Sequence, residues 1–186
     1  MKKLILILAV LLPLSALAQG TEAKIKRIKQ MYSEAQAKAS FKQSDEWMEK
    51  ACYTLDFKSR VNYAGGGPVE HSIEVFLVLA PDGDNPDSKR FNTFEPSFVR
   101  DTRQGSMKVY GEMLFDPDSG DLLFSYQRMA QADGTQKEQR YYYDRGRLVK
   151  AVPEGKPYYM FMTSDIALEH ARAIKSMVNG FNVVDN

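Results

Sequence analysis

The sequence is poor in the residues from which most catalytic and metal sites are built. It contains one cysteine, Cys52, and two histidines, His71 and His170. A single cysteine excludes an internal disulfide. Two histidines on separate predicted elements, with one cysteine, give little basis for a closed zinc site of four ligands. We therefore expect a fold stabilised by packing, without a bound metal or a cofactor.

An excess of charge of one sign is also missing. The chain has 25 basic and 24 acidic residues, so it lacks the strongly basic stripe typical of nucleic-acid-binding proteins. We expect no nucleic-acid partner. The apolar fraction of 44% and the aromatic fraction of 11% indicate a folded chain rather than a disordered one.

Only the N-terminus has a long hydrophobic run. Lys2 and Lys3 precede an apolar segment, residues 4–14, and a small-residue pattern ending at Ala18 follows it, as in a signal peptide. The run is shorter than the roughly 20 residues that span a bilayer, and no cysteine near the cleavage point could carry a lipid. We expect cleavage after Ala18, no stable membrane anchor, and a periplasmic or secreted mature protein that begins at Gln19.

The remaining residues, 19–186, suit a single domain, which we predict to be α+β. A helix is expected from Thr21, with an apolar seam at spacings of three and four residues. The seam consists of Ile25, Ile28, Tyr32, Ala35 and Ala39. Residues 40–52 are ambiguous, and Trp47 and Met48 are expected to dock a short helix or turn onto the core.

A change to a period of two at Tyr53 predicts a strand, residues 53–63, followed by a glycine-rich turn and a second strand, residues 69–80. A hairpin centred near Gly66 would place apolar side chains opposite each other and pair opposite charges. In that register Phe57 lies opposite Val75, Leu55 opposite Leu77, and Lys58 opposite Glu74. The next segment, 81–106, has no steady period and is predicted to be a long loop.

A second meander is predicted from turn residues between four apolar runs, which gives strands at 107–116, 121–131, 136–144 and 147–152. Two-residue turns at Asp133-Gly134 and Arg145-Gly146 set its register. They place Tyr126 opposite Tyr141, Phe124 opposite Tyr143, and Leu148 opposite Tyr143, all on a covered face. The other face is expected to be solvated and carries Ser125, Gln127, Glu138, Arg140, Tyr142, Asp144 and Arg147.

A C-terminal helix is predicted from a cap at Thr163 or Ser164, with Asp165 in its first turn, to a stop at Gly180. Its apolar face should cover the aromatic side of the second meander. That face comprises Ile166, Ala167, His170, Ala173, Ile174, Met177, Val178 and Phe181. The fold class is therefore an N-terminal helix, about six antiparallel strands, and a C-terminal helix packed on one sheet face.

Two runs of the second meander carry a resemblance. The run from Glu112 to Tyr126, EMLFDPDSGDLLFSY, and the run from Glu138 to Val149, EQRYYYDRGRLV, resemble uncharacterised exported proteins of Gram-negative bacteria that share this double hairpin. The similar region covers about a fifth of the chain. It implies an antiparallel meander and no chemistry, so no functional residue is carried over.

Candidate catalytic and metal residues are few. Cys52 with His71 or His170 would be a minimal nucleophile and base, but the apolar setting of each favours packing. Acidic turns at Asp82, Asp84 and Asp87 and at Asp116, Asp118 and Asp121 lack the glutamate that ends a calcium loop. Glu70 and Glu74, four residues apart on one strand, are too far apart to be a glycosidase pair, whereas the separation of Glu112 and Glu138 is open. The chain has no G-x-S-x-G, phosphate-binding or dinucleotide motif.

The solvated face of the second meander is the remaining candidate. Tyr142 flanked by Arg140 and Arg147, with Gln127 opposite Arg140, would offer stacking and charged hydrogen bonds to a ligand. We therefore expect a non-catalytic binding module for an envelope component, an extracellular protein or a small ligand. The alternatives are a small secreted hydrolase and a carrier of an apolar ligand, and ordinary cross-strand pairing would also explain these residues.

Overall fold

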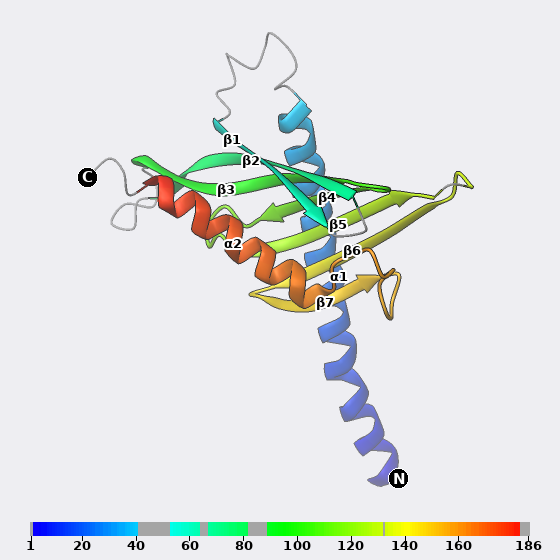
Figure 1. The fold of residues 1–186 in the computed structure, drawn as a ribbon. Helices are drawn as coiled ribbons and strands as arrows, with labels where there is room; N and C mark the ends of the chain where they lie inside the picture. Colours follow the sequence, from blue (N-terminus) through cyan, green and yellow to red (C-terminus); the bar gives the residue numbers. More distant parts are fainter. Residues whose placement is uncertain (1, 41–52, 64–66, 82–88, 132, 183–186) are drawn as a thin grey trace.

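The chain forms one antiparallel sheet between two helices. The computed structural model describes residues 2–40, 53–63, 67–81, 89–131 and 133–182. The elements in chain order are α1 (Lys2–Ser40), β1 (Tyr53–Tyr63), β2 (Gly67–Pro81), β3 (Lys89–Gln104), β4 (Lys108–Phe115), β5 (Leu122–Ala130), β6 (Gln136–Asp144), β7 (Arg147–Val152) and α2 (Ser164–Asn182). The seven strands lie in sequence order, each antiparallel to the next (Figure 1). The expected α+β meander is confirmed, with seven strands instead of about six.

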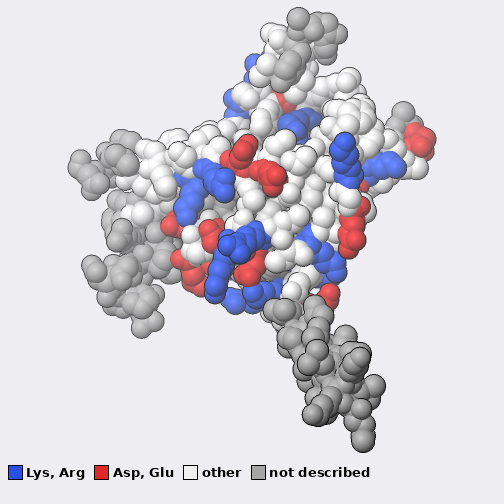
Figure 2. Space-filling view, turned by 90° about the horizontal axis from the view of Figure 1, so that it is seen from below, with Lys and Arg blue, Asp and Glu red and all other residues white. Residues whose placement is uncertain are grey.

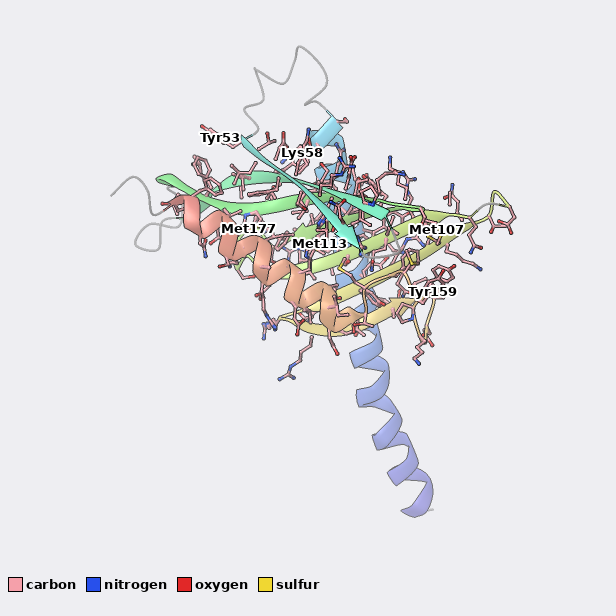
Figure 3. All side chains as sticks on the ribbon, in the orientation of Figure 1. Tyr53, Lys58, Met107, Met113, Tyr159 and Met177 are labelled. Carbon is pink, nitrogen blue, oxygen red and sulfur yellow. The ribbon has the colours of Figure 1, made fainter. Side chains whose placement is uncertain are left out.

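Helix α2 covers one face of the sheet. Its buried side chains are Ala167, Ala171, Ile174 and Val178, and they pack against strand residues that include Val75, Val99, Met113, Tyr141 and Tyr143. Figure 3 labels Met113 in the sheet and Met177 on the helix, both part of this layer. Burial of these side chains from water is the main force that holds the C-terminal helix in place.

The start of α2 agrees with the sequence, while part of its predicted apolar face does not. Thr163 caps the helix, because its hydroxyl oxygen accepts a hydrogen bond from the Ile166 backbone N–H at 3.4 Å. Ile166 and Phe181 are 50% and 54% exposed, so they do not belong to the covered face as expected. The helix also runs two residues beyond Gly180, to Asn182, whose side chain bonds both backbone groups of Phe94.

Helix α1 covers the opposite face. Its seam lies as predicted: Ile25, Ile28 and Ala39 are buried, and Tyr32 and Ala35 are half-buried. The seam packs on Phe76, Phe98, Leu114, Phe124 and Tyr142. No helix in the described part of the chain has a stretch long and apolar enough to cross a membrane.

The first hairpin has the predicted strands and a different register. Leu55 lies opposite Val75 and Phe57 opposite Ile73, a shift of two residues from the expected pairs. Lys58 therefore lies opposite Ser72 and not opposite Glu74. A two-residue shift leaves every side chain on its predicted face, so the apolar pattern alone did not distinguish the two registers.

The predicted loop at 81–106 is wrong, because residues 89–104 form β3, the third strand of the sheet. β3 pairs with both β2 and β4. Its Phe98 and Val99 are buried on opposite faces, while Asp101 and Arg103 are polar residues on the same face as Val99. Polar residues on the inward side of β3 concealed the alternation that identifies strands.

The second meander has strand bounds within one residue of those predicted, but its central turn differs. The Gln131 N–H donates to the Thr135 carbonyl at 2.8 Å, so three residues separate the last bonded pair and not two. Gly134 has φ +82°, the left-handed conformation that three-residue hairpins require. As a result Phe124 lies opposite Tyr142 and Tyr126 opposite Arg140, a slip of one residue that exchanges the faces of β6 relative to β5.

The turn at Arg145-Gly146 is the two-residue turn expected. Both residues have positive φ, 51° and 71°, as in a type I′ turn. Tyr143 therefore lies opposite Leu148, as predicted, although Leu148 is 45% exposed at the edge of the sheet.

Candidate functional site

The four predicted ligand-binding residues do not share a surface. Gln127 is fully buried beside the segment that precedes α2: its amide N–H donates to the Met162 carbonyl at 3.1 Å, and its amide oxygen accepts from the Met162 N–H at 2.7 Å. Tyr142 is 4% exposed and lies under α1 on the other face. Arg140 is half-buried beside α1, and Arg147 is exposed at the final turn. The expectation that these residues form one solvated patch is wrong, because it depended on the register that slipped.

Other sequence candidates resolve into local structure or lie outside the described residues. Cys52, Trp47, Met48 and the acidic residues at 82–87 are outside the described residues. The Asp116 carboxylate accepts hydrogen bonds from the backbone N–H groups of Asp118 and Ser119, at 2.9 and 3.2 Å. This second acidic cluster thus has a local turn function.

A polar cleft lies over the ends of β1 to β4. Its volume is about 540 Å³, within the range of small-molecule sites. The lining residues are Lys58, Ser59, Arg60, Glu70, His71, Ser72, Thr102, Gln104 and Lys108. Figure 3 labels Lys58 on β1.

Strand alternation explains why these side chains gather. Lys58 lies opposite Ser72, which lies opposite Thr102, so the three form a row across β1, β2 and β3. A second row runs through Arg60, Glu70, Gln104 and Lys108. Both rows have the parity of Phe76 and Phe98, so they belong to the face that α1 covers farther along the strands.

The cleft concentrates positive charge. It has three cationic side chains, Lys58, Arg60 and Lys108, and one acidic side chain, Glu70. Within the residues that the structure describes, none of the three cations makes an ion pair. Figure 2 shows a face of the molecule on which basic and acidic side chains lie beside one another.

A smaller pocket of about 270 Å³ lies beside the cleft on the same face, under α1. It is lined by Tyr32, Gln36, Tyr110, Glu112, Tyr126, Arg128 and Arg140. Thr102 of the cleft lies opposite Tyr110 of this pocket, so the two depressions adjoin. Arg128 stacks over the ring of Tyr110 at 4.7 Å, and Arg140 over that of Tyr126 at 5.1 Å.

Glu112 is the buried centre of this pocket, with 3% exposure. Its carboxylate accepts hydrogen bonds from the hydroxyls of Tyr32 and Tyr110, the latter at 2.6 Å, and from the Gln36 amide at 3.0 Å. Arg100 lies 3.9 Å away. These donors offset the loss of hydration that a buried carboxylate suffers, and they connect α1 to the sheet.

The same contacts shift the pKa values of the tyrosine hydroxyls. Burial, the hydrogen bond to Glu112 and its negative charge all raise the pKa of Tyr32 far above its ordinary value, and they raise that of Tyr110 in the same direction. Burial and the hydrogen bond to Glu138 raise the pKa of Tyr126 to about 12. The three hydroxyls therefore stay protonated and act as hydrogen-bond donors at neutral pH. Glu112 and Glu138 each have these structural partners, so neither stands free as a catalytic acid.

A third cluster lies on the α2 face and joins both histidines of the chain. Nε2 of His71 on β2 lies 2.8 Å from Oδ1 of Asp101 on β3, and Nε2 of His170 on α2 lies 3.1 Å from Oδ2. The His71 contact is a hydrogen bond, whereas His170 Nε2 is buried without an aligned partner among the described residues. The ligand atoms of the three residues lie within 4.8 Å of one another.

Asp101 is 3% exposed. Burial alone would raise the pKa of its carboxyl group, but His170 and His71 outweigh this and hold the pKa well below its ordinary range. Asp101 is thus a buried anion between two imidazoles.

The apolar pattern predicts packed positions for both histidines, and it does not identify Asp101 because residues 81–106 have no steady period. The alternation of β3, once recognised, would have put Asp101 on the same face as Val99 and beside Ile73 and His71.

No family model, curated protein or solved structure matches the chain. The site and its function therefore rest on the residues themselves.

Proposed function

We propose that the protein is an exported, non-catalytic binding protein that takes a small anionic ligand in the cleft over β1 to β4. The observation that carries the proposal is the grouping of Lys58, Arg60 and Lys108 around a cleft of about 540 Å³ with a single acid. Lysine and arginine side chains recognise carboxylate, phosphate and sulfate groups by charge-assisted hydrogen bonds.

Polar neighbours extend this recognition. Ser72, Thr102 and Gln104 provide hydroxyl and amide groups that donate or accept hydrogen bonds to the uncharged part of a ligand. The adjoining tyrosine pocket places the Arg128 and Arg140 guanidinium groups at the next position along the face. A ligand with an anionic group and several hydroxyls, such as an acidic sugar, has the matching chemistry.

The alternative of a carrier for an apolar ligand has less support. A cavity with apolar walls lies between α1 and the sheet, beside Ile28, Phe124 and Tyr142, and its volume is about 170 Å³. Small-molecule sites usually have at least about 300 Å³. The larger cleft is lined by charged residues and by side chains with hydroxyl or amide groups, and their functional groups favour a charged ligand.

The proposed location is the periplasm or the exterior, on the basis of the N-terminal pattern that ends at Ala18. The mature protein would then meet envelope glycans and other anionic extracellular compounds. Mass spectrometry of the protein from its host tests this part. We expect a chain that begins at Gln19, and a chain that retains residues 1–18 would contradict export with cleavage.

Ligand binding is tested by calorimetry with defined anionic probes: inorganic sulfate, galacturonate oligomers, and a heparin disaccharide that carries both sulfate and carboxylate groups. We expect at least one organic probe to bind. Lys58→Ala and Lys108→Ala should each weaken its affinity about tenfold, equivalent to about 1.4 kcal/mol. Binding should also weaken between low and high salt, because exposed charges are screened.

Lys137→Ala is the matched control, since Lys137 is an exposed lysine of the same sheet that does not line the cleft. The affinity of the Lys137→Ala protein for the probe should equal that of the unmodified protein. Equal weakening by the control, or probe binding that is indifferent to Lys58 and Lys108, would refute a site in this cleft.

A further inference from the structure

We propose that His71, Asp101 and His170 form a binding site for a divalent transition-metal ion of the zinc type. The proposal concerns the α2 face, and the site shares one residue, His71, with the anion cleft. It rests on the convergence of three metal-ligating side chains from three elements, β2, β3 and α2, that are far apart in the sequence.

The donor set fits this class of ion. Imidazole nitrogen and carboxylate oxygen are the ligands that zinc and its neighbours prefer, whereas calcium and magnesium take oxygen ligands almost exclusively. Two nitrogens and one oxygen from the protein leave one position of a tetrahedral site for water or a ligand, as in catalytic zinc centres. His71 and His170 are 26% and 21% exposed, so solvent reaches the cluster.

The distances are close to those of a metal site. Bonds of about 2.0–2.1 Å to a tetrahedral zinc ion separate its ligand atoms by roughly 3.4 Å. The two histidine contacts of Asp101, 2.8 Å to Oδ1 and 3.1 Å to Oδ2, need a small expansion to reach this value, and the ligand atoms, all within 4.8 Å of one another, need to draw together where they are farthest apart. A modest side-chain movement therefore converts the cluster into a coordination shell.

The hydrogen bonding within the cluster also favours a bound metal ion. His170 Nε2 is buried close to the carboxylate without the alignment of a hydrogen bond, so its polar atom is unsatisfied among the described residues. A buried polar atom without a partner is costly, and a metal bond to its lone pair removes that cost.

The surroundings leave room on one side and carry an opposing charge on another. Gly111 lies opposite Asp101 on β4 and presents no side chain beside the carboxylate. Arg103 lies opposite His71 on the same face, and its positive charge disfavours a cation. With one anionic ligand and a nearby arginine, the site should be weaker than a structural zinc site.

The test is calorimetric titration with Zn²⁺ of folded protein from which a chelator has removed any metal. Visible absorption with Co²⁺ as a spectroscopic probe supports it. We expect one ion per chain and intense Co²⁺ bands of a four-coordinate centre. His170→Asn should weaken Zn²⁺ affinity by at least about 100-fold, because loss of groups that merely support a metal ligand already costs 10–100-fold. Mg²⁺ and Ca²⁺ at millimolar concentration should not displace the ion.

His170 is the residue to change, because His71 also lines the cleft. Position 170 is partly exposed on a helix, so the variant should fold. Asp118→Asn is the matched control in the acidic turn and should bind Zn²⁺ as the unmodified protein does. Absence of Zn²⁺ and Co²⁺ binding by folded protein, or affinity unchanged in His170→Asn, would overturn the proposal and leave the cluster as a structural hydrogen-bonded group.

Discussion

At the scale of single residues, Phe124 and Tyr142 define which way the second meander faces. Their rings lie 4.9 Å apart under α1, and Tyr32 meets Phe124 edge-on at 4.6 Å. Both are almost fully buried. Neither can therefore be shortened without leaving a cavity.

We expect Phe124→Ala and Tyr142→Ala each to lower the free energy of unfolding by about 3–5 kcal/mol, because both truncate large side chains in a packed layer. Arg147→Ala, at an exposed position of the adjacent strand, should stay within about 0.5 kcal/mol. Urea unfolding followed by circular dichroism measures all three. If Tyr142→Ala left the free energy of unfolding unchanged, the result would favour the register predicted from the sequence, in which Tyr142 faces solvent.

At the scale of elements, turn chemistry identified strands well and fixed their pairing poorly. The bounds of β4 to β7 followed from aspartate and glycine turns, and the Arg145-Gly146 turn also gave the correct pairs. Asp133-Gly134 did not, since the same two residues occur in two- and three-residue hairpins that differ by one position. That single residue placed Tyr142 and Gln127 on opposite faces of the sheet, and both side chains are buried because both faces are covered.

Helix periodicity was more reliable, because each helix presents one stripe to the sheet. The seam of α1 was predicted in full. On α2 the predicted stripe was too wide, because Ile166 and Phe181 are apolar and yet lie beyond the edge of the layer. Neither the cleft nor the His71–Asp101–His170 cluster could be predicted, since both depend on strand pairing and on β3.

The limits of the α2 stripe give a matched pair of variants on one helix. Ile174 is fully buried and Ile166 is half-exposed. Ile174→Ala should lower the free energy of unfolding by about 2–5 kcal/mol. Ile166→Ala should change it by about 0.5 kcal/mol or less. Thermal melts of the two variants, measured side by side, test this difference. Equal losses of stability would show that α2 is rotated from the position described.

At the scale of the whole molecule, a polar contact couples the N-terminal helix to the sheet. Tyr32 of α1 donates its hydroxyl hydrogen to the buried Glu112 of β4. Burial of Tyr32, its hydrogen bond to Glu112 and the negative charge of Glu112 all raise the pKa of the Tyr32 hydroxyl.

A group whose pKa is raised by folding stabilises the fold below its unfolded pKa, about 10 for tyrosine, and loses that contribution as the pH rises above it. We therefore expect Tyr32→Phe to lower the free energy of unfolding at pH 8 by about 1.5–3 kcal/mol, as loss of a hydrogen bond to a charged group does. Between pH 8 and pH 11 the difference from the unmodified protein should narrow. Urea unfolding at both pH values measures it, and a constant difference would argue against a protonated Tyr32 at Glu112.

The strand order of the sheet is also the order of synthesis. Each strand pairs with the one made just before it, so a growing chain meets its partners locally, and such topologies form quickly. By Val152 the sheet has two apolar faces, and only α1 has been made to cover one of them. In the exported chain proposed above, the Val99 and Tyr143 layer stays open to water until α2 packs on it, and a chaperone outside the cytoplasm that shields this layer would serve the folding chain best at that stage.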